Sequence, residues 1–338
     1  MPPVSTSHNM SSDSSNAQTR RPRSLLPGVY VPTICIFDKK TENLDTQAIG
    51  KHAIRLAHAG VAGLAVHGSN GEAVHLSNEE RVAAIETTRK ALDDSGFTDM
   101  PLIVGCSAHS TREAIKLCQQ AYAAGADYAL VLAPSYYRPL LLPESIPEFY
   151  RDVADASPLP IIIYNYPAAV SGLDLDSDTL ISLGKHPNII GCKFTCGNTG
   201  KMNRVAAAHP TQLGYPNPAS SSVFMCFGGS GDFTLQTLIG GGAGIIGGIA
   251  NIAPKTCVRV MDLYYGGKLD EARKAQAILA RGDWAAIQGG VVGIKSAMES
   301  YLGYGGFARK PLPRPTVETT GKWAKEFREL VEFEESLQ

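Results

Sequence analysis

Short apolar segments alternate with amphipathic ones along most of the chain, at a spacing of about 30 residues. The apolar segments carry few polar side chains, which is typical of strands buried on both faces of a parallel sheet. We therefore expect eight strands, at residues 28–37, 63–67, 102–106, 128–133, 160–164, 188–195, 223–227 and 244–249.

The segments between these strands have the 3.6-residue period of amphipathic helices. Two of them begin with a capping box, Ser77–Glu80 and Ser110–Glu113, in which a serine precedes a glutamate by three positions. Eight strand–helix units over about 230 residues predict an α/β fold, a (β/α)₈ TIM barrel. The alternative, a doubly wound open sheet, normally has fewer units and a nucleotide-binding fingerprint after its first strand. The predicted helices are residues 45–59, 77–94, 110–124, 145–156, 177–183, 200–208, 232–239 and 254–265.

The two ends of the chain differ from this central part, residues 25–266. Residues 1–24 are rich in serine and contain three arginines, which predicts a disordered tail. A mitochondrial presequence is the alternative, but the tail has almost no apolar residues to form an amphipathic face. Residues 267–338 predict helices packed on the barrel, at 269–280, at 286–302 and from Gly321 onward. The last helix has an apolar side formed by Trp323, Phe327, Leu330, Val331 and Phe333.

Composition excludes several classes of function. The net charge is −1 and 19% of residues are charged, so we expect no nucleic-acid or membrane partner. The seven cysteines are an odd number within mostly apolar segments, which indicates reduced thiols of a cytoplasmic protein. No histidine or cysteine spacing matches a metal site, so we expect no metal. Gly242–Gly247 matches the G-x-G-x-x-G motif of dinucleotide-binding proteins, but it lies inside a glycine-rich strand instead of opening a helix after one, so we expect no cofactor.

Lys193 lies inside the apolar segment Asn188–Thr195, where a lysine is unusual. Burial of an ammonium group costs several kcal/mol unless the group is paired or loses its proton, and no acidic residue is near in sequence. A desolvated lysine has a lowered pKa, and its neutral amine is a nucleophile for carbonyl carbon. The alternative is a lysine that ends the strand and extends its amine to water.

Other polar side chains follow the predicted strands, at the end of the barrel where catalytic residues gather. Ser69 and Asn70 lie between two glycines, so their side chains and the backbone could hold a carboxylate, although a plain polar turn has the same pattern. Tyr164 ends the fifth strand, where its phenol could relay protons or only pack in the core. Glycines end the seventh and eighth strands and would leave a cavity. Together these residues suit a Schiff-base enzyme acting on a 2-oxo acid, with Lys193 attacking the keto carbon.

These motifs resemble the dihydrodipicolinate synthase/N-acetylneuraminate lyase family of class I aldolases over residues 27–311. The matching segments are Gly68–Glu72, Tyr164–Pro167 and Asn188–Lys193. The resemblance implies that Lys193 forms the Schiff base and that Tyr164 relays protons. It also implies further roles, as follows. Ser69 and Asn70 would bind the pyruvyl carboxylate and assist the relay, and Gly71 belongs to the same binding motif. Gly229 and the Ile246 backbone would line the pocket, and Thr195 occupies a pocket position that varies with substrate. Tyr136 would enter the active site of a neighbouring subunit in a homotetramer or dimer.

Within the family the chain looks most like eukaryotic 4-hydroxy-2-oxoglutarate aldolases and fungal 2-keto-3-deoxy-L-galactonate aldolases. Ala169 stands where dihydrodipicolinate synthases carry an arginine, which argues against lysine biosynthesis, and Phe194 replaces a commonly acidic residue. The resemblance implies cleavage of a 2-keto-3-deoxy sugar acid or 4-hydroxy-2-oxo acid to pyruvate and an aldehyde. A hydro-lyase or condensing synthase, and a non-catalytic pyruvate-binding barrel, remain as alternatives. The aldehyde half is expected to depend on residues 168–171 and 215–222.

Overall fold

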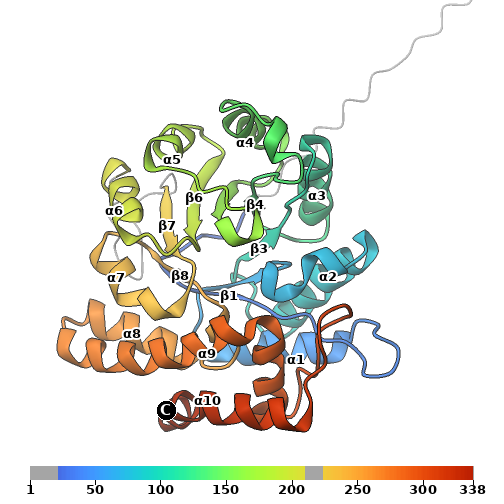
Figure 1. The fold of residues 1–338 in the computed structure, drawn as a ribbon, viewed down its shortest axis with the longest axis vertical. Helices are drawn as coiled ribbons and strands as arrows, with labels where there is room; N and C mark the ends of the chain where they lie inside the picture. Colours follow the sequence, from blue (N-terminus) through green and yellow to red (C-terminus); the bar gives the residue numbers. More distant parts are fainter. Residues whose placement is uncertain (1–21, 210–223, 338) are drawn as a thin grey trace, which may run out of the picture.

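The eight strands of the protein form a closed barrel in a computed structural model that describes residues 22–209 and 224–337 (Figure 1). Every strand runs parallel to its neighbours in sequence, and β8 closes the barrel by pairing with β1. The closed barrel confirms the predicted fold and excludes the open sheet. Most of the expected N-terminal tail and all of residues 215–222 lie outside the described residues.

The strands are shorter than the apolar segments that predicted them. The first segment extends to Phe37, yet β1 ends at Pro32, and the last extends to Ile249, yet β8 ends at Ile246. Ile34 to Phe37 and Ile249 are nevertheless buried. These residues are apolar because the segments after the two strands are buried, although they do not belong to the strands. The strands are β1 Gly28–Pro32, β2 Gly63–Val66, β3 Leu102–Gly105, β4 Tyr128–Leu132, β5 Ile161–Asn165, β6 Ile189–Phe194, β7 Met225–Gly228 and β8 Gly244–Ile246.

Eight helices follow the strands and surround the barrel. The Ser77–Glu80 capping box forms in full at the start of α2, with both reciprocal hydrogen bonds. The second predicted box is only half made, because Ser110 Oγ accepts from the Glu113 N–H while the Glu113 carboxylate lies near Asn78 and Lys116. The helices are α1 Thr46–His58, α2 Asn78–Asp94, α3 Thr111–Ala123, α4 Ser145–Ala156, α5 Ser177–Leu183, α6 Thr199–Ala208, α7 Thr234–Ile239 and α8 Pro254–Tyr265.

Two further helices, α9 Leu269–Leu302 and α10 Val317–Ser336, pack against α8 and each other (Figure 1). The predicted break over residues 281–285 is wrong, because the chain leaves helical geometry at Gly290, with φ 54° and ψ −153°. Gly282 instead serves packing, since a Cβ there would lie 2.4 Å from a Leu330 side-chain carbon. Helix α10 also begins before the predicted Gly321, at a capping box made by Thr316 and Thr319.

The core has two layers, one inside the barrel and one between the strands and the helices. Tyr30, Ile103, Ile162 and Phe227 are among the buried side chains of the inner layer. The outer layer extends to α10, where Phe327, Leu330 and Val331 are buried as the apolar pattern predicts.

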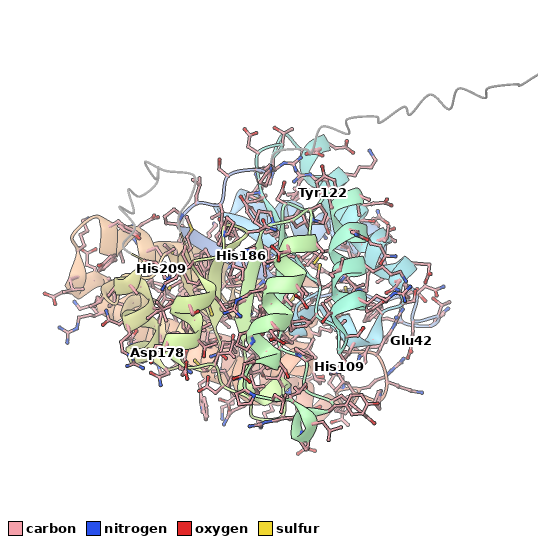
Figure 2. The ribbon with its side chains drawn as sticks, turned by 90° about the horizontal axis from the view of Figure 1, so that it is seen from above. Glu42, His109, Tyr122, Asp178, His186 and His209 are labelled. Atoms are coloured by element: carbon pink, nitrogen blue, oxygen red, sulfur yellow. The ribbon has the colours of Figure 1, made fainter. Side chains whose placement is uncertain are left out.

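The structure also bears on the expected classes of site. All seven cysteines are free thiols, and all but Cys196 are buried. In the described ranges, no three His, Cys, Asp or Glu side chains group as metal ligands, and Figure 2 shows His109, His186 and His209 apart from one another. None of the helices in those ranges is long and apolar enough to cross a membrane.

Candidate active site

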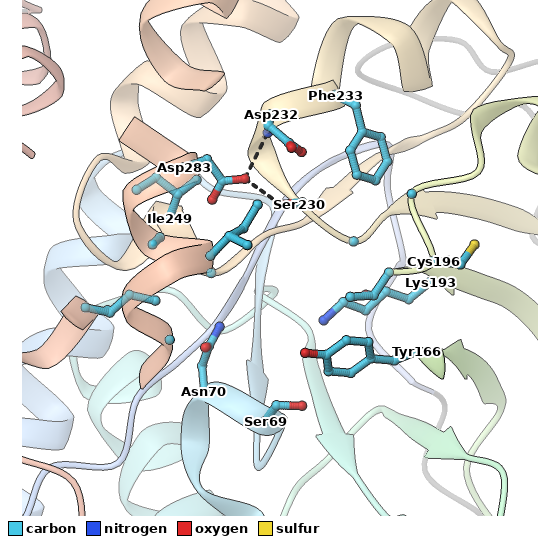
Figure 3. Close-up of a pocket in the computed structure, with 18 of the residues that line it drawn as sticks. Ser69, Asn70, Tyr166, Lys193, Cys196, Ser230, Asp232, Phe233, Ile249 and Asp283 are labelled. Carbon is cyan, nitrogen blue, oxygen red and sulfur yellow. Dashed lines mark hydrogen bonds between the residues drawn. The ribbon is translucent and has the colours of Figure 1, made fainter. Parts of the chain in front are cut away.

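A cavity of about 590 Å³ lies at the carboxyl ends of the strands (Figure 3). Its lining comes from the carboxyl ends of five strands and the turns after them, from Gln236 of α7, and from α9, which packs against the turns after β2, β7 and β8. The residues that the strand ends contribute include Ser69 after β2, Tyr164 in β5, Lys193 in β6, Gly229 after β7 and Gly248 after β8. The polar strand ends singled out in the sequence therefore meet at one site.

An irregularity at the start of β6 determines where Lys193 points. In the pairing of β5 with β6, Ile161 lies opposite Ile189, but the next residue, Ile162, lies opposite Gly191. Strand β6 therefore has one extra residue, Ile190, at this point. Beyond this shift Cys192 belongs to the outer core layer, and side chains of a strand alternate between its faces. Lys193 therefore points into the barrel.

Lys193 differs from the other buried lysines in the described part of the chain. Lys201 pairs with Asp174, and Lys295 pairs with Glu72. Lys193 is 3% exposed, and no carboxylate within the described ranges lies within 4 Å of its amine. The side chain therefore does not extend to the protein surface, as the alternative interpretation would require, and its amine faces the cavity without an ion pair.

Tyr164 lies beside Lys193 at the same register position of the neighbouring strand. Lys193 Nζ is 4.2 Å from the centroid of the Tyr164 ring, and Tyr164 Oη is 3.3 Å from Ser69 Oγ, within hydrogen-bond distance. Tyr166 stacks on Tyr164 with 5.6 Å between ring centroids, and burial raises the pKa of Tyr166. The phenol of Tyr164 thus connects the amine to the loop that contains Ser69.

Two glycines allow polar side chains to approach the cavity closely. A Cβ on Gly229 would lie 2.1 Å from Thr195 Oγ1, and a Cβ on Gly248 would lie 2.3 Å from Asn70 Nδ2. Thr195 Oγ1 is buried and has no hydrogen-bond partner within the described residues. A buried hydroxyl without a partner is free to bond to a ligand.

Asp283 of α9 lines the side of the cavity opposite Ser69 (Figure 3). One of its carboxylate oxygens, Oδ2, accepts hydrogen bonds from the Ser230 hydroxyl and, at 2.9 Å, from the Asp232 backbone N–H. Burial, with a smaller contribution from the nearby Asp232 carboxylate, raises the Asp283 pKa to about 6. Burial also raises the pKa of Asp232.

Glu72 fixes the loop that contains Ser69 and Asn70. It has a left-handed backbone with φ 51°, which is uncommon outside glycine, directly after this loop. Glu72 Oε1 is 2.5 Å from Lys295 Nζ, and Oε2 accepts from the Arg309 N–H at 2.9 Å and lies 3.0 Å from His75 Nδ1. The loop is therefore tied to α9 and to the segment after it.

The cavity brings together six of the residues predicted for the site, and three lie elsewhere. The six are Lys193, Tyr164, Ser69, Asn70, Thr195 and Gly229. Gly71 and Ile246 are buried next to the cavity but do not line it. Tyr136 is 74% exposed and packs edge-on against Tyr137, away from the cavity of its own chain.

Several residues of the cavity were not predicted from the sequence. Asp283, Ala286, Ile287 and Gly290 come from α9, which follows the barrel in the chain and gives no sign in its sequence that it covers the site. Ser230 and Asp232 could have been found, because they are polar residues directly after the seventh strand.

These features define a (β/α)₈ barrel with a polar pocket at the carboxyl ends of its strands. The chain belongs to the dihydrodipicolinate synthetase family, whose model matches residues 26–332. This finding confirms the family resemblance inferred from the motifs.

Individual relatives agree over nearly the full length. The chain is 53% identical over 317 residues to a protein of Emericella nidulans named probable 4-hydroxy-2-oxoglutarate aldolase, mitochondrial, covering 94% of this chain and 98% of the relative. It is 50% identical over 316 residues to the L-threo-3-deoxy-hexylosonate aldolase of Hypocrea jecorina, covering 94% and 99%. A crystal structure of a dihydrodipicolinate synthase family protein from Coccidioides immitis superposes with a TM-score of 0.81 at 34% identity, covering 94% and 99%.

Proposed function

We propose that this protein is a class I aldolase that cleaves a 2-keto-3-deoxy sugar acid or a 4-hydroxy-2-oxo acid to pyruvate and an aldehyde. The observation that carries the proposal is the amine of Lys193, buried without a carboxylate partner in the described ranges and directed into a polar cavity beside Tyr164. The family and the names of the two fungal relatives support the same reaction.

The proposed reaction begins with attack of the neutral Lys193 amine on the keto carbon of the substrate. Loss of water then gives an iminium, with Ser69 and Asn70 holding the adjacent carboxylate. A base removes the proton of the C4 hydroxyl, the C3–C4 bond breaks, and its electron pair enters the iminium to form an enamine. The aldehyde leaves, the enamine takes a proton at C3, and water releases pyruvate and the free lysine.

Tyr164 is the candidate for the proton transfers. Its hydroxyl lies within hydrogen-bond distance of Ser69 Oγ, so a proton can pass between the phenol and the carboxylate-binding loop. Lys193 Nζ also lies 4.2 Å from the centroid of the Tyr164 ring, which supports a role for the phenol near the carbon that the amine would bind. We propose that Gly71 and the Ile246 backbone, which are buried next to the cavity, support the binding of the substrate.

A pyruvate-release assay tests the proposed function. The purified protein is incubated with 2-keto-3-deoxy-hexonates and with 4-hydroxy-2-oxoglutarate, and pyruvate is detected with a coupled enzyme. We expect pyruvate from at least one substrate, and Lys193→Ala should lower kcat by more than about a thousandfold, since the covalent step is lost. Lys201→Ala is the matched control, because Lys201 is a buried lysine outside the cavity. Full lyase activity in Lys193→Ala would refute the mechanism.

Assembly and compartment complete the proposal. We propose a homodimer or homotetramer in which the exposed Tyr136 of one subunit enters the cavity of another.

For the cellular compartment, the composition favours the cytoplasm, whereas the name of the Emericella relative supports mitochondria. A fluorescent fusion of the full chain, imaged against a mitochondrial marker, distinguishes the two.

A further inference from the structure

We propose that this pocket selects an uncharged, hydroxyl-bearing aldehyde half, so that the substrate is a 2-keto-3-deoxy sugar acid and not the dicarboxylic 4-hydroxy-2-oxoglutarate. The inference rests on the proposed aldolase function and specifies its substrate class. It follows from the distribution of charge and of free hydrogen-bond acceptors around the cavity.

The cavity has two ends of different chemistry (Figure 3). Ser69 and Asn70 lie at one end and offer a hydroxyl and an amide N–H, which are hydrogen-bond donors for the substrate's C1 carboxylate. Asp232 and Asp283 lie at the other end. With the keto carbon at Lys193 between them, we expect the chain beyond C3 to extend towards the two aspartates. None of residues 168–171, on which the aldehyde half was expected to depend, lines this cavity.

The charges of the lining disfavour a second carboxylate. Among the described residues that line the cavity, Lys193 is the one basic side chain, and it is used by the keto carbon. The distal end has two carboxyl groups and no cation in that lining to compensate them. An entering carboxylate would meet like charges in a partly desolvated site, which is unfavourable.

The same end is suited to hydroxyl groups. Asp232 Oδ1 is buried and has no hydrogen-bond partner in the described ranges, so it can accept a bond from a substrate hydroxyl. Thr195 Oγ1 is likewise without a partner, and Gln236 adds an amide to the lining. A carboxylate oxygen accepts a hydrogen bond from an alcohol but not from another carboxylate.

Two hydrogen bonds fix the position of the Asp283 carboxyl group at this end of the cavity. The Ser230 hydroxyl and the Asp232 backbone N–H both donate to Asp283 Oδ2, which fixes the carboxyl group and joins it to the loop after β7. Asp283 itself is 2% exposed. A buried polar site built for hydroxyls discriminates strongly against substrates that cannot form the same hydrogen bonds.

The test compares kcat/KM of the full-length protein for 2-keto-3-deoxy-L-galactonate and for 4-hydroxy-2-oxoglutarate. We expect the sugar acid to be preferred by at least about tenfold. Asp232→Asn and Asp283→Asn should each lower this preference by about tenfold. The neutral amide is a weaker acceptor for the substrate hydroxyls, which raises KM for the sugar acid, and its N–H can donate to a carboxylate, which lowers KM for the dicarboxylate. Asp270→Asn is the matched control, since Asp270 lies in α9 with a side chain that is 92% exposed.

The outcomes separate the two proposals. If the wild type releases pyruvate from the dicarboxylate at an equal or higher kcat/KM, the substrate class is overturned and the aldolase function stands. If both aspartate variants keep the wild-type preference, the role assigned to the distal carboxyl groups is overturned. If neither substrate gives pyruvate, the proposed function fails and this inference fails with it.

Discussion

Lys295 and Glu72 form an ion pair with no exposed surface on the lysine side chain, and 2.5 Å separate Lys295 Nζ from Glu72 Oε1. The pair joins α9 to the residue that follows the Ser69–Gly71 turn. Lys295 also donates to the Phe307 carbonyl, and Glu72 accepts from the Arg309 N–H. Helix α9 and the segment between α9 and α10 therefore hold the loop that is proposed to bind the substrate's carboxylate.

Removal of one partner of this pair should destabilise the protein. Lys295→Met leaves the Glu72 carboxylate buried without its cation, and such single changes cost about 3–5 kcal/mol. The double variant Glu72→Gln/Lys295→Met should be destabilised by less than the sum of the two single variants. Urea unfolding of all four proteins gives the coupling free energy. Additive effects would show that the pair does not act as a unit.

The Asp283 carboxyl group should make stability depend on pH. Its pKa is raised from 3.8 to about 6 in the folded state, so the folded protein binds more protons than the unfolded chain between these pH values. Stability therefore decreases as pH rises through this window, by up to about 3 kcal/mol from this group. Asp283→Asn removes the effect, and its Tm should exceed that of the wild type by more at pH 8 than at pH 4.5. An equal Tm difference at the two pH values would contradict the assignment.

Gly229→Ala should damage both folding and activity. The added Cβ would lie 2.1 Å from Thr195 Oγ1 and 2.5 Å from Thr195 Cα, so a rotation of the threonine side chain cannot relieve the contact. We expect a loss of about 1–3 kcal/mol and a large decrease in kcat/KM. Gly321→Ala is the control, because a Cβ there has no neighbour within 4 Å and alanine favours helix by about 0.5–1 kcal/mol. Thermal unfolding of both variants should therefore shift in opposite directions.

Subunit mixing tests the proposed role of Tyr136. If Tyr136 acts in the cavity of a neighbour, Tyr136→Phe and Lys193→Ala are each impaired as pure proteins. After unfolding and refolding together, mixed assemblies contain a cavity with its own Lys193 and a neighbour's Tyr136, so activity should return. Mixing without refolding is the control. Activity that stays at the sum of the two separate variants would place Tyr136 outside the site.

The barrel and most of the cavity could be predicted because both depend on local sequence. Each strand is an apolar segment, and the residues after its carboxyl end necessarily gather at one end of a closed barrel. That rule is sufficient to place Ser69, Tyr164, Lys193 and Gly229 at the same end. The inward direction of Lys193 could not be read in this way, because it depends on the shifted pairing of β5 with β6.

The contributions of α9 could not be predicted, because they depend on how a later helix packs across the barrel. Gly290 and Asp283 reach the cavity through long-range contacts that no local pattern records. The predicted position of the break in α9 is also wrong, since the polar residues and glycine at 281–285 are compatible with a continuous helix. Gly282 lies against Leu330 of α10, so its purpose is visible only in the packed structure.

The most direct test of the central claim is to trap the covalent intermediate. The protein is incubated with pyruvate, reduced with borohydride, digested and analysed by mass spectrometry. A Schiff-base mechanism predicts one reduced pyruvyl adduct on the peptide that contains Lys193, and none in Lys193→Ala. An adduct confined to another lysine, or turnover of substrate with no adduct at all, would contradict the account.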